Sequence, residues 1–554
     1  MTTDQVHETV ASHLCAVLAD IEVRTVFGLP GITNLPVIEA LRLSDATRFV
    51  VTRHEQCAGH MADASARMGA NLGVLLVDLG PGLANALTAI LAAGRDSVPL
   101  LVIAGNEHQT LIGREVWHEM PDTEVFGPVT RYCGAVPSAE AFPRYLRQAI
   151  QAATTARPGP AFLSVPKNLW SEPVGAPRAA FTPTAAPAPD RNALSNSLAL
   201  LRQASRPVVV AGARARRGAC PDAVARLCET WSLPLVTSPN GRGVLDEAHP
   251  LCMGHAGRFG QRQASKTLLE ADTLLVLGCR LDDLTTHDWH LLNDGQRVIQ
   301  VDPDAHVIGQ NWPTDISLVS DVAAFAEAAA DAIGDGPRPG FWSLDERFAE
   351  RTAERAAFLA IDDPLRVKPQ AVMRHLEGAA PPDTTVVMGG GRFQQFAGEW
   401  LVRDPLGFFY AANSGTVGFA LSAAIGVAIE HPHRTVLCIL GDGDFMMHSQ
   451  ELETAIRERA NVKIVILNDF AYGAMLARQA TSYGTEYSNP DFAELAAVYG
   501  AVGRRVSHGG DITASVGWLF DQRGPAVLDV IVDRDETRSL LFGHDIGDKA
   551  AIAG

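Results

Sequence analysis

Residues 434–473 read RTVLCILGDGDFMMHSQELETAIRERANVKIVILNDFAYG, and this stretch decides the fold. The apolar run 434–440 predicts a buried strand, and the run 462–467 predicts a second one. Between them a helical pattern places Leu452 and Ile456 on one face. A strand, a helix and a strand in this order predict a right-handed βαβ unit with two parallel strands in one sheet.

Acidic residues follow both predicted strands. Residues 441–444 (GDGD) follow the first strand, and Asn468 and Asp469 follow the second. Because the carboxyl ends of parallel strands share one edge of a sheet, we expect Asp442 and Asp469 to lie close together. Two carboxylates and a backbone carbonyl suit Mg²⁺, which also takes oxygens from a diphosphate. GDG alone is typical of an ordinary turn with a capping aspartate, but the second acidic turn favours the metal site.

Length and composition limit the classes of function. The chain has 554 residues, of which 47% are hydrophobic and 20% charged, so we expect about three globular domains. A net charge of −17 argues against nucleic acid or an anionic membrane as the main partner. Eight cysteines without a C-x-x-C pair indicate free thiols in a reducing compartment. With no signal-peptide pattern and no uninterrupted apolar span, we expect a cytoplasmic protein.

The domain organisation follows from two linkers. Residues 171–189 are rich in proline and alanine, and 334–340 (GDGPRPG) opens a second linker with a charged helical segment to about Ala360. Elsewhere short β-branched runs alternate with helical segments, which predicts an α/β fold of three doubly wound parallel-sheet domains. We predict domains at 1–172, 190–334 and 362–535, followed by a tail at 536–554.

A faint internal repeat links the first and last domains. Residues 59–90 and 418–456 both read as a helix of small residues, a strand, a glycine-rich turn and a helix. The two domains therefore share a topology, or two βαβ units resemble each other by chance.

Residues 441–473 resemble the cofactor motif of thiamine diphosphate enzymes, and of acetolactate synthases and benzoylformate decarboxylases in particular. The resemblance implies Mg²⁺ with Asp442 and Asp469 as side-chain ligands and Ala471 as a carbonyl ligand. Many relatives carry Asn at position 469, and both residue types supply an oxygen. We expect the Asp444 side chain to point away from the diphosphate while its N–H binds it. The implied cofactor contacts here are Gly441, Asp442, Gly443, Asp444, Phe445, Asp469, Ala471, Tyr472 and Gly473.

Glu55 is the candidate activating group. It lies in residues 53–56 (RHEQ), between a predicted strand at 48–52 and a predicted helix at 56–68. An isolated glutamate there is an ordinary first-turn residue favoured by the helix dipole. The segment resembles the His-Glu motif of the family, however, and 80–85 (GPGLAN) follows it. The resemblance implies that Glu55 hydrogen-bonds the aminopyrimidine ring of the cofactor, a task that suits a partly buried carboxyl with a raised pKa.

Further parts of the site follow from the same resemblance. Relatives place the glutamate and the metal site on different subunits, which implies a homodimer or homotetramer with active sites at the interface. Gly415 and Val417 are implied to receive the pyrimidine ring. The second arm around the diphosphate is implied to comprise Gly391, Arg392 and Gln394. Residues 278–283 (GCRLDD) are similar to the flavin segment of acetolactate synthases, so the implied central ligand is FAD, ADP or none.

The residues that choose the substrate match the family less well. Ile32, Asp78 and Thr285 align with a Ser and two His of benzoylformate decarboxylase. The adjacent His-His pair of pyruvate decarboxylases is also absent, because His108 is followed by Gln109. A simple decarboxylase is therefore disfavoured. The acetolactate synthase pattern fits better, and the predicted pocket residues are Ile32, Trp117, His118, Met475 and Arg478.

Candidate proton shuttles are His54, Asp78 and His118, each of which is otherwise a structural hydrogen-bonding residue. With Glu55 they form the predicted catalytic set. Arg478 either binds an anionic group of the substrate or is an exposed helix arginine.

We expect decarboxylation of a pyruvate-like 2-oxo acid and transfer of the activated aldehyde to a second carbonyl. One alternative is a benzoylformate decarboxylase-like enzyme or 2-hydroxyacyl lyase without carboligation. The other is a non-catalytic homologue, against which the presence of Glu55, Asp442 and Asp469 counts.

Overall fold

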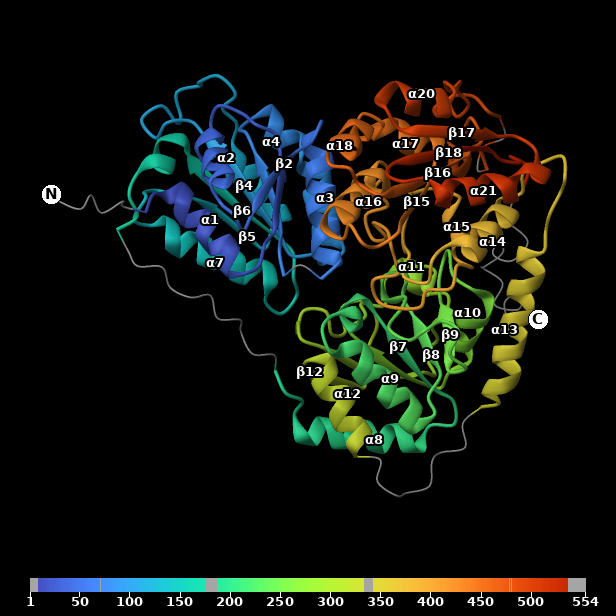
Figure 1. Ribbon diagram of the computed structural model, residues 1–554. Coiled ribbons are helices and arrows are strands. Elements are labelled where there is room, and N and C mark those ends of the chain that lie inside the picture. Colours follow the sequence, from blue (N-terminus) through green and yellow to red (C-terminus); the bar gives the residue numbers. More distant parts are fainter. Residues whose placement is uncertain are drawn as a thin grey trace.

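The computed structural model describes residues 8–69, 71–175, 187–332, 342–477, 479 and 481–536. The chain forms three lobes, each built on a six-stranded parallel sheet with helices against it (Figure 1). The predicted α/β fold of three parallel-sheet domains is confirmed. No helix in the described part of the chain is long and apolar enough to cross a membrane.

The N-terminal sheet has the strand order β2-β1-β3-β4-β6-β5. Its strands are β1 (Thr25–Gly28), β2 (Arg48–Val51), β3 (Gly73–Val77), β4 (Leu100–Asn106), β5 (Tyr132–Ala135) and β6 (Pro160–Pro166). Its helices are α1 (Val10–Asp20), α2 (Leu35–Arg42), α3 (Glu55–Arg67), α4 (Pro81–Asn85), α5 (Leu87–Arg95), α6 (Asp122–Phe126) and α7 (Phe142–Thr154).

The central sheet has the order β12-β11-β10-β7-β8-β9. Its strands are β7 (Pro207–Ala211), β8 (Leu235–Thr237), β9 (Cys252–His255), β10 (Thr273–Leu277), β11 (Arg297–Asp302) and β12 (Ile316–Val319). The helices are α8 (Arg191–Gln203), α9 (Cys220–Trp231), α10 (Arg262–Glu270), α11 (Asp283–Thr286) and α12 (Val322–Asp331). Counted within the domain, this is the order 3-2-1-4-5-6 of dinucleotide-binding sheets, which bind ligands where the order reverses, between β7 and β10.

The C-terminal sheet has the order β14-β13-β15-β16-β18-β17. Its strands are β13 (Thr385–Met388), β14 (Phe408–Phe409), β15 (Val436–Gly441), β16 (Val462–Asn468), β17 (Val502–Val506) and β18 (Ala526–Ile531). The helices are α14 (Pro369–Ala379), α15 (Gln394–Ala397), α16 (Phe419–Glu430), α17 (Asp442–His448), α18 (Glu451–Arg457), α19 (Gly473–Leu476), α20 (Phe492–Tyr499) and α21 (Ile512–Asp521).

The first and last domains share one topology, because both sheets have the order 2-1-3-4-6-5 when counted from their own first strand. The internal repeat therefore reflects a repeated architecture. Each proposed domain range encloses one sheet, and the charged segment before residue 360 forms α13 (Leu344–Leu359). Most of the two predicted linkers, at 176–186 and 333–341, and the tail from 537 lie outside the described residues.

The N- and C-terminal domains share a core along α3 and α16 (Figure 1). Helix α16 is apolar on every side and buried along nearly its whole length, as expected of a helix without a solvent face. A Cβ at Gly426 would lie 2.8 Å from the Met61 Cα, so the glycine allows the two helices to meet. This contact fixes the start of α3, which carries Glu55, against the C-terminal domain.

Candidate active site

Asp442 and Asp469 lie at the same edge of the C-terminal sheet. Strand β15 ends at Gly441, which pairs with Leu467 of the parallel strand β16. Asp442 then begins α17, and Asp469 follows the last residue of β16. The two turns are therefore neighbours at the carboxyl ends of adjacent strands.

The Asp442 carboxylate is almost fully buried and held in place. Its Oδ2 accepts hydrogen bonds from the Phe470 N–H at 2.9 Å and the Asn489 amide at 2.7 Å. Burial, and secondly the charge of Asp469, raise the pKa of Asp442 to about 6. The negative charge of the nearby Asp469 carboxylate therefore disfavours the ionised form of Asp442.

Asp469 is also buried, and burial raises its pKa while the Arg392 guanidinium opposes that shift. The Arg392 Nε lies 3.2 Å from Asp469 Oδ2. Within the described residues neither carboxylate oxygen has a hydrogen-bond partner of good geometry. Buried carboxylate oxygens in this condition are stabilised by a cation, so the pair fits a hard divalent metal.

The loop after β16 closes over this pair. Phe470 has a left-handed backbone with φ of 55°, and Ala471 behind it is buried. The Tyr472 ring meets Tyr487 edge to face at 4.9 Å. A Cβ at Gly443 would come within 2.8 Å of the Tyr487 hydroxyl, so only glycine fits between the turn and these rings.

Phe445 lies in the protein core. It is fully buried and packs edge to face on Phe492 at 5.1 Å. Its side chain therefore packs α17 against α20, and only its backbone is available to a cofactor.

The Asp444 side chain binds the backbone of two glycines. Its Oδ2 accepts the Gly390 N–H at 2.9 Å, and its Oδ1 accepts the Gly418 N–H. Burial raises the pKa of Asp444 to about 7, while these two hydrogen bonds oppose the shift. The carboxylate thus ties together the two glycine-rich arms that the sequence assigns to the cofactor.

The two arms face each other, since a Cβ at Gly390 would lie 3.5 Å from a methyl group of Val417. Gly391 and Gly415 both have positive φ. Arg392, expected on the diphosphate arm, turns toward Asp469, whereas Gln394 lies nearly buried in α15. The arm that carries Gly391, Arg392 and Gln394 therefore also contacts Asp469, in the turn after β16.

Glu55 is the first residue of α3 and is half-buried at the carboxyl edge of the N-terminal sheet. Its Oε2 accepts a hydrogen bond from the Asn85 amide at 3.0 Å. A Cβ at Gly82 would lie 3.0 Å from Oε1, so the glycine turn leaves that oxygen accessible. Asn85 and Gly82 both belong to the short helix α4 after β3. The segment around Glu55 and the 80–85 motif therefore form one unit.

The candidate proton shuttles have other partners. Asp78 Oδ1 accepts the Thr33 N–H at 3.2 Å. His54 caps α3, because its Nδ1 accepts the Gln56 N–H at 3.1 Å. His118 stacks on Trp117 with ring centroids 3.8 Å apart. Among the described residues, none forms a hydrogen bond that fixes the His118 ring, so His118 is the candidate with the most freedom to exchange a proton.

Apolar side chains are exposed in both halves of the site. Ile32 and Trp117 in the N-terminal domain are 65% and 76% exposed, and Tyr472 and Met475 in the C-terminal domain are 53% and 49% exposed. Large apolar side chains grouped at a ligand-binding edge indicate a surface that another chain or a ligand covers. Arg478 lies outside the described residues.

Three residues near Asp442 and Asp469 were not predicted from the sequence. Asn489 binds Asp442, the Tyr487 hydroxyl sits beside the turn, and Arg534 donates from Nε to the Asp469 carbonyl at 2.9 Å. The Asn489-Pro490 pair signals a turn, but nothing in the sequence pattern pairs that turn with Asp442.

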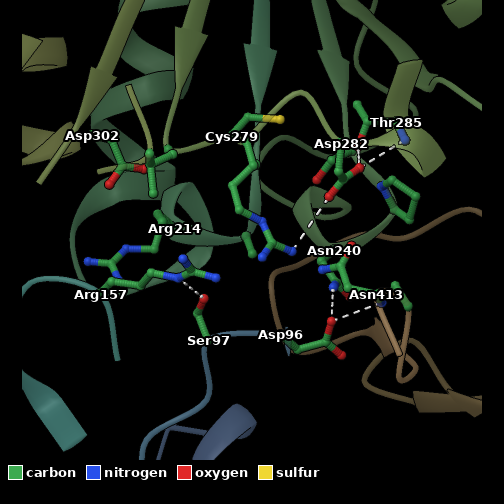
Figure 2. Close-up of a pocket in the computed structure, with 18 residues that line it drawn as sticks. Asp96, Ser97, Arg157, Arg214, Asn240, Cys279, Asp282, Thr285, Asp302 and Asn413 are labelled. Atoms are coloured by element: carbon green, nitrogen blue, oxygen red, sulfur yellow. Dashed lines mark hydrogen bonds and ion pairs between the residues drawn. The ribbon is translucent and has the colours of Figure 1, made fainter. Parts of the chain in front are cut away.

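A cavity apart from Asp442 and Asp469 lies where the three domains meet. Figure 2 shows Arg157 and Arg214 side by side at this cavity, with Arg157 Nε 3.0 Å from Ser97 Oγ. Burial lowers the pKa of both guanidinium groups. Asp302, at the end of β11, lines the same cavity, and so does Thr285, whose hydroxyl binds Asp282. Thr285 therefore belongs to the central domain cavity.

Comparison with known proteins gives matches along the whole chain. Family models described as "Thiamine pyrophosphate enzyme" match as the N-terminal TPP binding domain at residues 8–125, the central domain at 194–329 and the C-terminal TPP binding domain at 389–530. An acetolactate synthase of Arthrospira platensis is 30% identical over 96% of both chains. The acetolactate synthase isozyme 3 large subunit of Escherichia coli (strain K12) is 31% identical over 94% of both chains.

Proposed function

The chain belongs to the thiamine diphosphate-dependent enzyme family, as a relative of acetolactate synthase large subunits, and we propose that it joins an activated aldehyde to a carbonyl acceptor. The aldehyde unit derives from a pyruvate-like 2-oxo acid by loss of carbon dioxide. The resemblance inferred from residues 441–473 is confirmed by these relatives. The observation that carries the proposal is that the similarity covers nearly the full length, including both halves of the site.

We propose that Asp442 and Asp469 hold Mg²⁺, with the Ala471 carbonyl as a third ligand from the protein. Support comes from the burial of both carboxylates and from the Asp469 carboxylate oxygens, which accept no hydrogen bond of good geometry from the residues that the structure describes. Gly441 and Gly443 leave room for the diphosphate, and Asp444 holds the arms that carry Gly391 and Gly415. A divalent cation here also balances the negative charge that Arg392 offsets only in part.

Glu55 is proposed to move the activating proton. Bound thiamine diphosphate would supply a nucleophilic thiazolium carbon and an electron sink for the decarboxylation of the donor. Asn85 binds Oε2 of Glu55, and Oε1, which lies beside Gly82, is proposed to share a proton with the pyrimidine ring. In the C-terminal domain, Tyr472 and Met475 are exposed in the single chain. They are proposed to exclude water from the donor when a second copy of the chain covers them.

The proposed assembly is a homodimer or a dimer of dimers. Glu55 hydrogen-bonds within its own domain, and the apolar edges of both halves are exposed in the single chain. A second copy that covers both edges completes the site. All eight cysteines are free thiols, which supports a reducing, cytoplasmic location.

Substrate selection is assigned to residues beside these edges. His118 is proposed to exchange protons with the acceptor, and Trp117, Met475 and Ile32 to shape an apolar pocket. Arg478 is proposed to bind a substrate carboxylate. His54 and Asp78 are assigned to positioning, because each already has a structural hydrogen bond.

For the central cavity we propose an adenine nucleotide, either FAD or ADP. The cavity lies where the strand order reverses, Asp302 is placed to bind ribose hydroxyls, and Arg157 and Arg214 offer buried positive charge to phosphates. Denaturing the purified protein and measuring flavin fluorescence and released adenine nucleotide tests this. Loss of the nucleotide in Arg214→Gln, with retention in the surface variant Arg226→Gln, is the expected result.

The function itself is tested with a panel of 2-oxo acids, each with and without aldehyde or 2-oxo acid acceptors, and products are identified by mass. Carboligation products from a pyruvate-like donor support the proposal. Free aldehyde as the sole product would instead support a simple decarboxylase or lyase. Failure of thiamine diphosphate and Mg²⁺ to bind in calorimetry would support a non-catalytic homologue.

A further inference from the structure

A cluster of metal-ligating side chains lies outside the proposed cofactor site, between the N- and C-terminal domains. His54 caps α3, Cys57 lies one turn further along α3, and His448 ends α17. One potential ligand atom from each of the three side chains lies within 4.8 Å of the others. Figure 1 shows that α3 faces α16 and α18 of the same chain, so the cluster spans the boundary between the two domains.

The cluster has the chemistry of a zinc site. Imidazole nitrogen and thiolate sulfur are the usual ligands of Zn²⁺, with bonds of about 2.0–2.3 Å. The spacing H-x-x-C at the start of α3 places His54 and Cys57 on one side of the helix. Tetrahedral bonds of that length put ligand atoms roughly 3–4 Å apart, so side-chain rotations of about 1 Å close the present arrangement.

His448 is prepared as a ligand by its surroundings. Its Nδ1 lies 2.6 Å from the carbonyl oxygen of Gly418. A carbonyl only accepts hydrogen bonds, so Nδ1 carries the proton and Nε2 keeps a free lone pair. Metal-bound histidines in proteins are oriented in this way by a hydrogen bond from the other ring nitrogen.

Glu451 lies beside the cluster and supplies negative charge next to Cys57. It begins α18, is fully buried, and its carboxylate contacts the Cys57 thiol through a hydrogen bond. It also accepts the Arg53 backbone N–H and the Thr454 hydroxyl, and no Lys or Arg side chain in the described ranges pairs with it. The thiolate of Cys57 and the adjacent carboxylate of Glu451 together balance the charge of a divalent cation.

We propose that His54, Cys57 and His448 bind a Zn²⁺-class cation that ties the start of α3 to α17, with Glu451 of α18 beside Cys57 as its charge partner. Binding releases the thiol proton of Cys57 to solvent and uses no oxidant. His54 is only half-buried and forms the mouth of the site, whereas Cys57 and His448 are buried. To bind the cation the His54 ring must release its cap on the Gln56 N–H, because a neutral ring that accepts at Nδ1 carries its proton on Nε2. Since Glu55 follows His54 directly, the cation would fix the orientation of Glu55 relative to the C-terminal domain of its own chain.

Cobalt is the probe for the test, because Co²⁺ bound to thiolate gives a charge-transfer band and tetrahedral d–d bands that an all-oxygen site does not give. The full-length protein, saturated with thiamine diphosphate and Mg²⁺, is titrated with Co²⁺ and followed by absorbance. We expect these bands to saturate at one cation per chain and to disappear when Zn²⁺ is added. Their absence in the wild-type protein would overturn the proposal.

Variants then assign the ligands. Cys57→Ser is expected to lose the charge-transfer band, and His448→Asn to weaken Co²⁺ binding at least tenfold with the thiol intact. Cys133→Ser, which changes a half-buried thiol far along the chain, serves as the matched control. Asp442→Ala removes a proposed Mg²⁺ ligand and is expected to keep the bands, which separates this site from the cofactor site. Bands that persist in both Cys57→Ser and His448→Asn would refute the assignment even if one variant folds poorly.

Discussion

The carboxylate of Asp444 accepts a hydrogen bond from the backbone N–H of Gly390, 2.9 Å away. The other oxygen of the same carboxylate accepts the N–H of Gly418. One buried side chain from the turn after β15 therefore holds both glycine arms at a fixed separation. A negative charge at Asp444 is unfavourable beside a diphosphate, but this carboxylate holds in place the two arms that we propose to bind the diphosphate.

Asp444→Asn should weaken the binding of thiamine diphosphate by about 10–100-fold. An amide keeps one acceptor and turns an N–H group toward the other backbone N–H, and a buried unsatisfied donor costs about 1–3 kcal/mol. Isothermal titration calorimetry with saturating Mg²⁺ measures the change. Asp521→Asn, at an exposed helix end, is the control. Equal affinity in both variants would show that the tie between the arms is dispensable.

Binding of Mg²⁺ should depend on pH through Asp442. Burial, followed by the charge of Asp469, raises the pKa of Asp442 to about 6 in the metal-free protein. Since a proton competes with the metal, the apparent affinity should fall about tenfold per pH unit below pH 6 and level off above pH 7. Mg²⁺ titrations between pH 5 and 8, followed by tryptophan fluorescence, measure this.

Asp469→Asn tests the same interaction from the other side. It keeps an oxygen ligand and removes a negative charge beside Asp442, so the pH at which Mg²⁺ affinity declines should move downward. Binding at pH 7 should be largely retained, whereas Asp442→Ala should abolish it. If the pH profile of Asp469→Asn matched the wild type, the two carboxylates would not share a cation.

Mixing two inactive subunits tests whether the active site is shared between chains. Glu55→Gln should bind the cofactor but lose most turnover, and Asp442→Ala should fail to bind Mg²⁺. If Glu55 and the metal pair meet across an interface, a heterodimer of the two variants regains one intact site. Co-expression should then restore about a quarter of the wild-type activity by random pairing. Activity no higher than that of the single variants would place both groups in one chain.

Much of this fold and site can be predicted from the sequence because its signals are local. The runs at 436–440 and 463–467 are buried strands with β-branched residues, and the structure has β15 and β16 there. Glu55 was expected just before a helix and is the first residue of α3. The glycine and aspartate turns after these strands follow from parallel-sheet geometry alone.

Contacts between distant segments could not be predicted in the same way. Asn489 reaches Asp442 from the loop before α20, and Asp444 reaches back to Gly390 across the sheet. Neither contact leaves a spacing or periodicity in the sequence. The pairing of His54 with His448 likewise depends on how two domains pack, which no local pattern encodes.

Arg242 should be one of the most sensitive positions for stability. Its guanidinium is fully buried and binds both carboxylate oxygens of Glu247, each at 2.8 Å. Glu247 also accepts the Val402 N–H, and Arg242 stacks over Phe408 at 4.5 Å, so the pair joins the central domain to the C-terminal one. Removing one partner leaves an uncompensated buried charge, which costs about 3–5 kcal/mol.

Arg242→Met should therefore lower the unfolding midpoint strongly. The double variant Arg242→Met with Glu247→Leu should recover part of the loss, because neither charge then remains buried. Arg226→Met, which breaks an exposed ion pair with Asp331, should change stability by no more than about 1 kcal/mol. Urea unfolding followed by circular dichroism compares the three variants with the wild type. A loss as small in Arg242→Met as in Arg226→Met would mean that the domains dock without this ion pair.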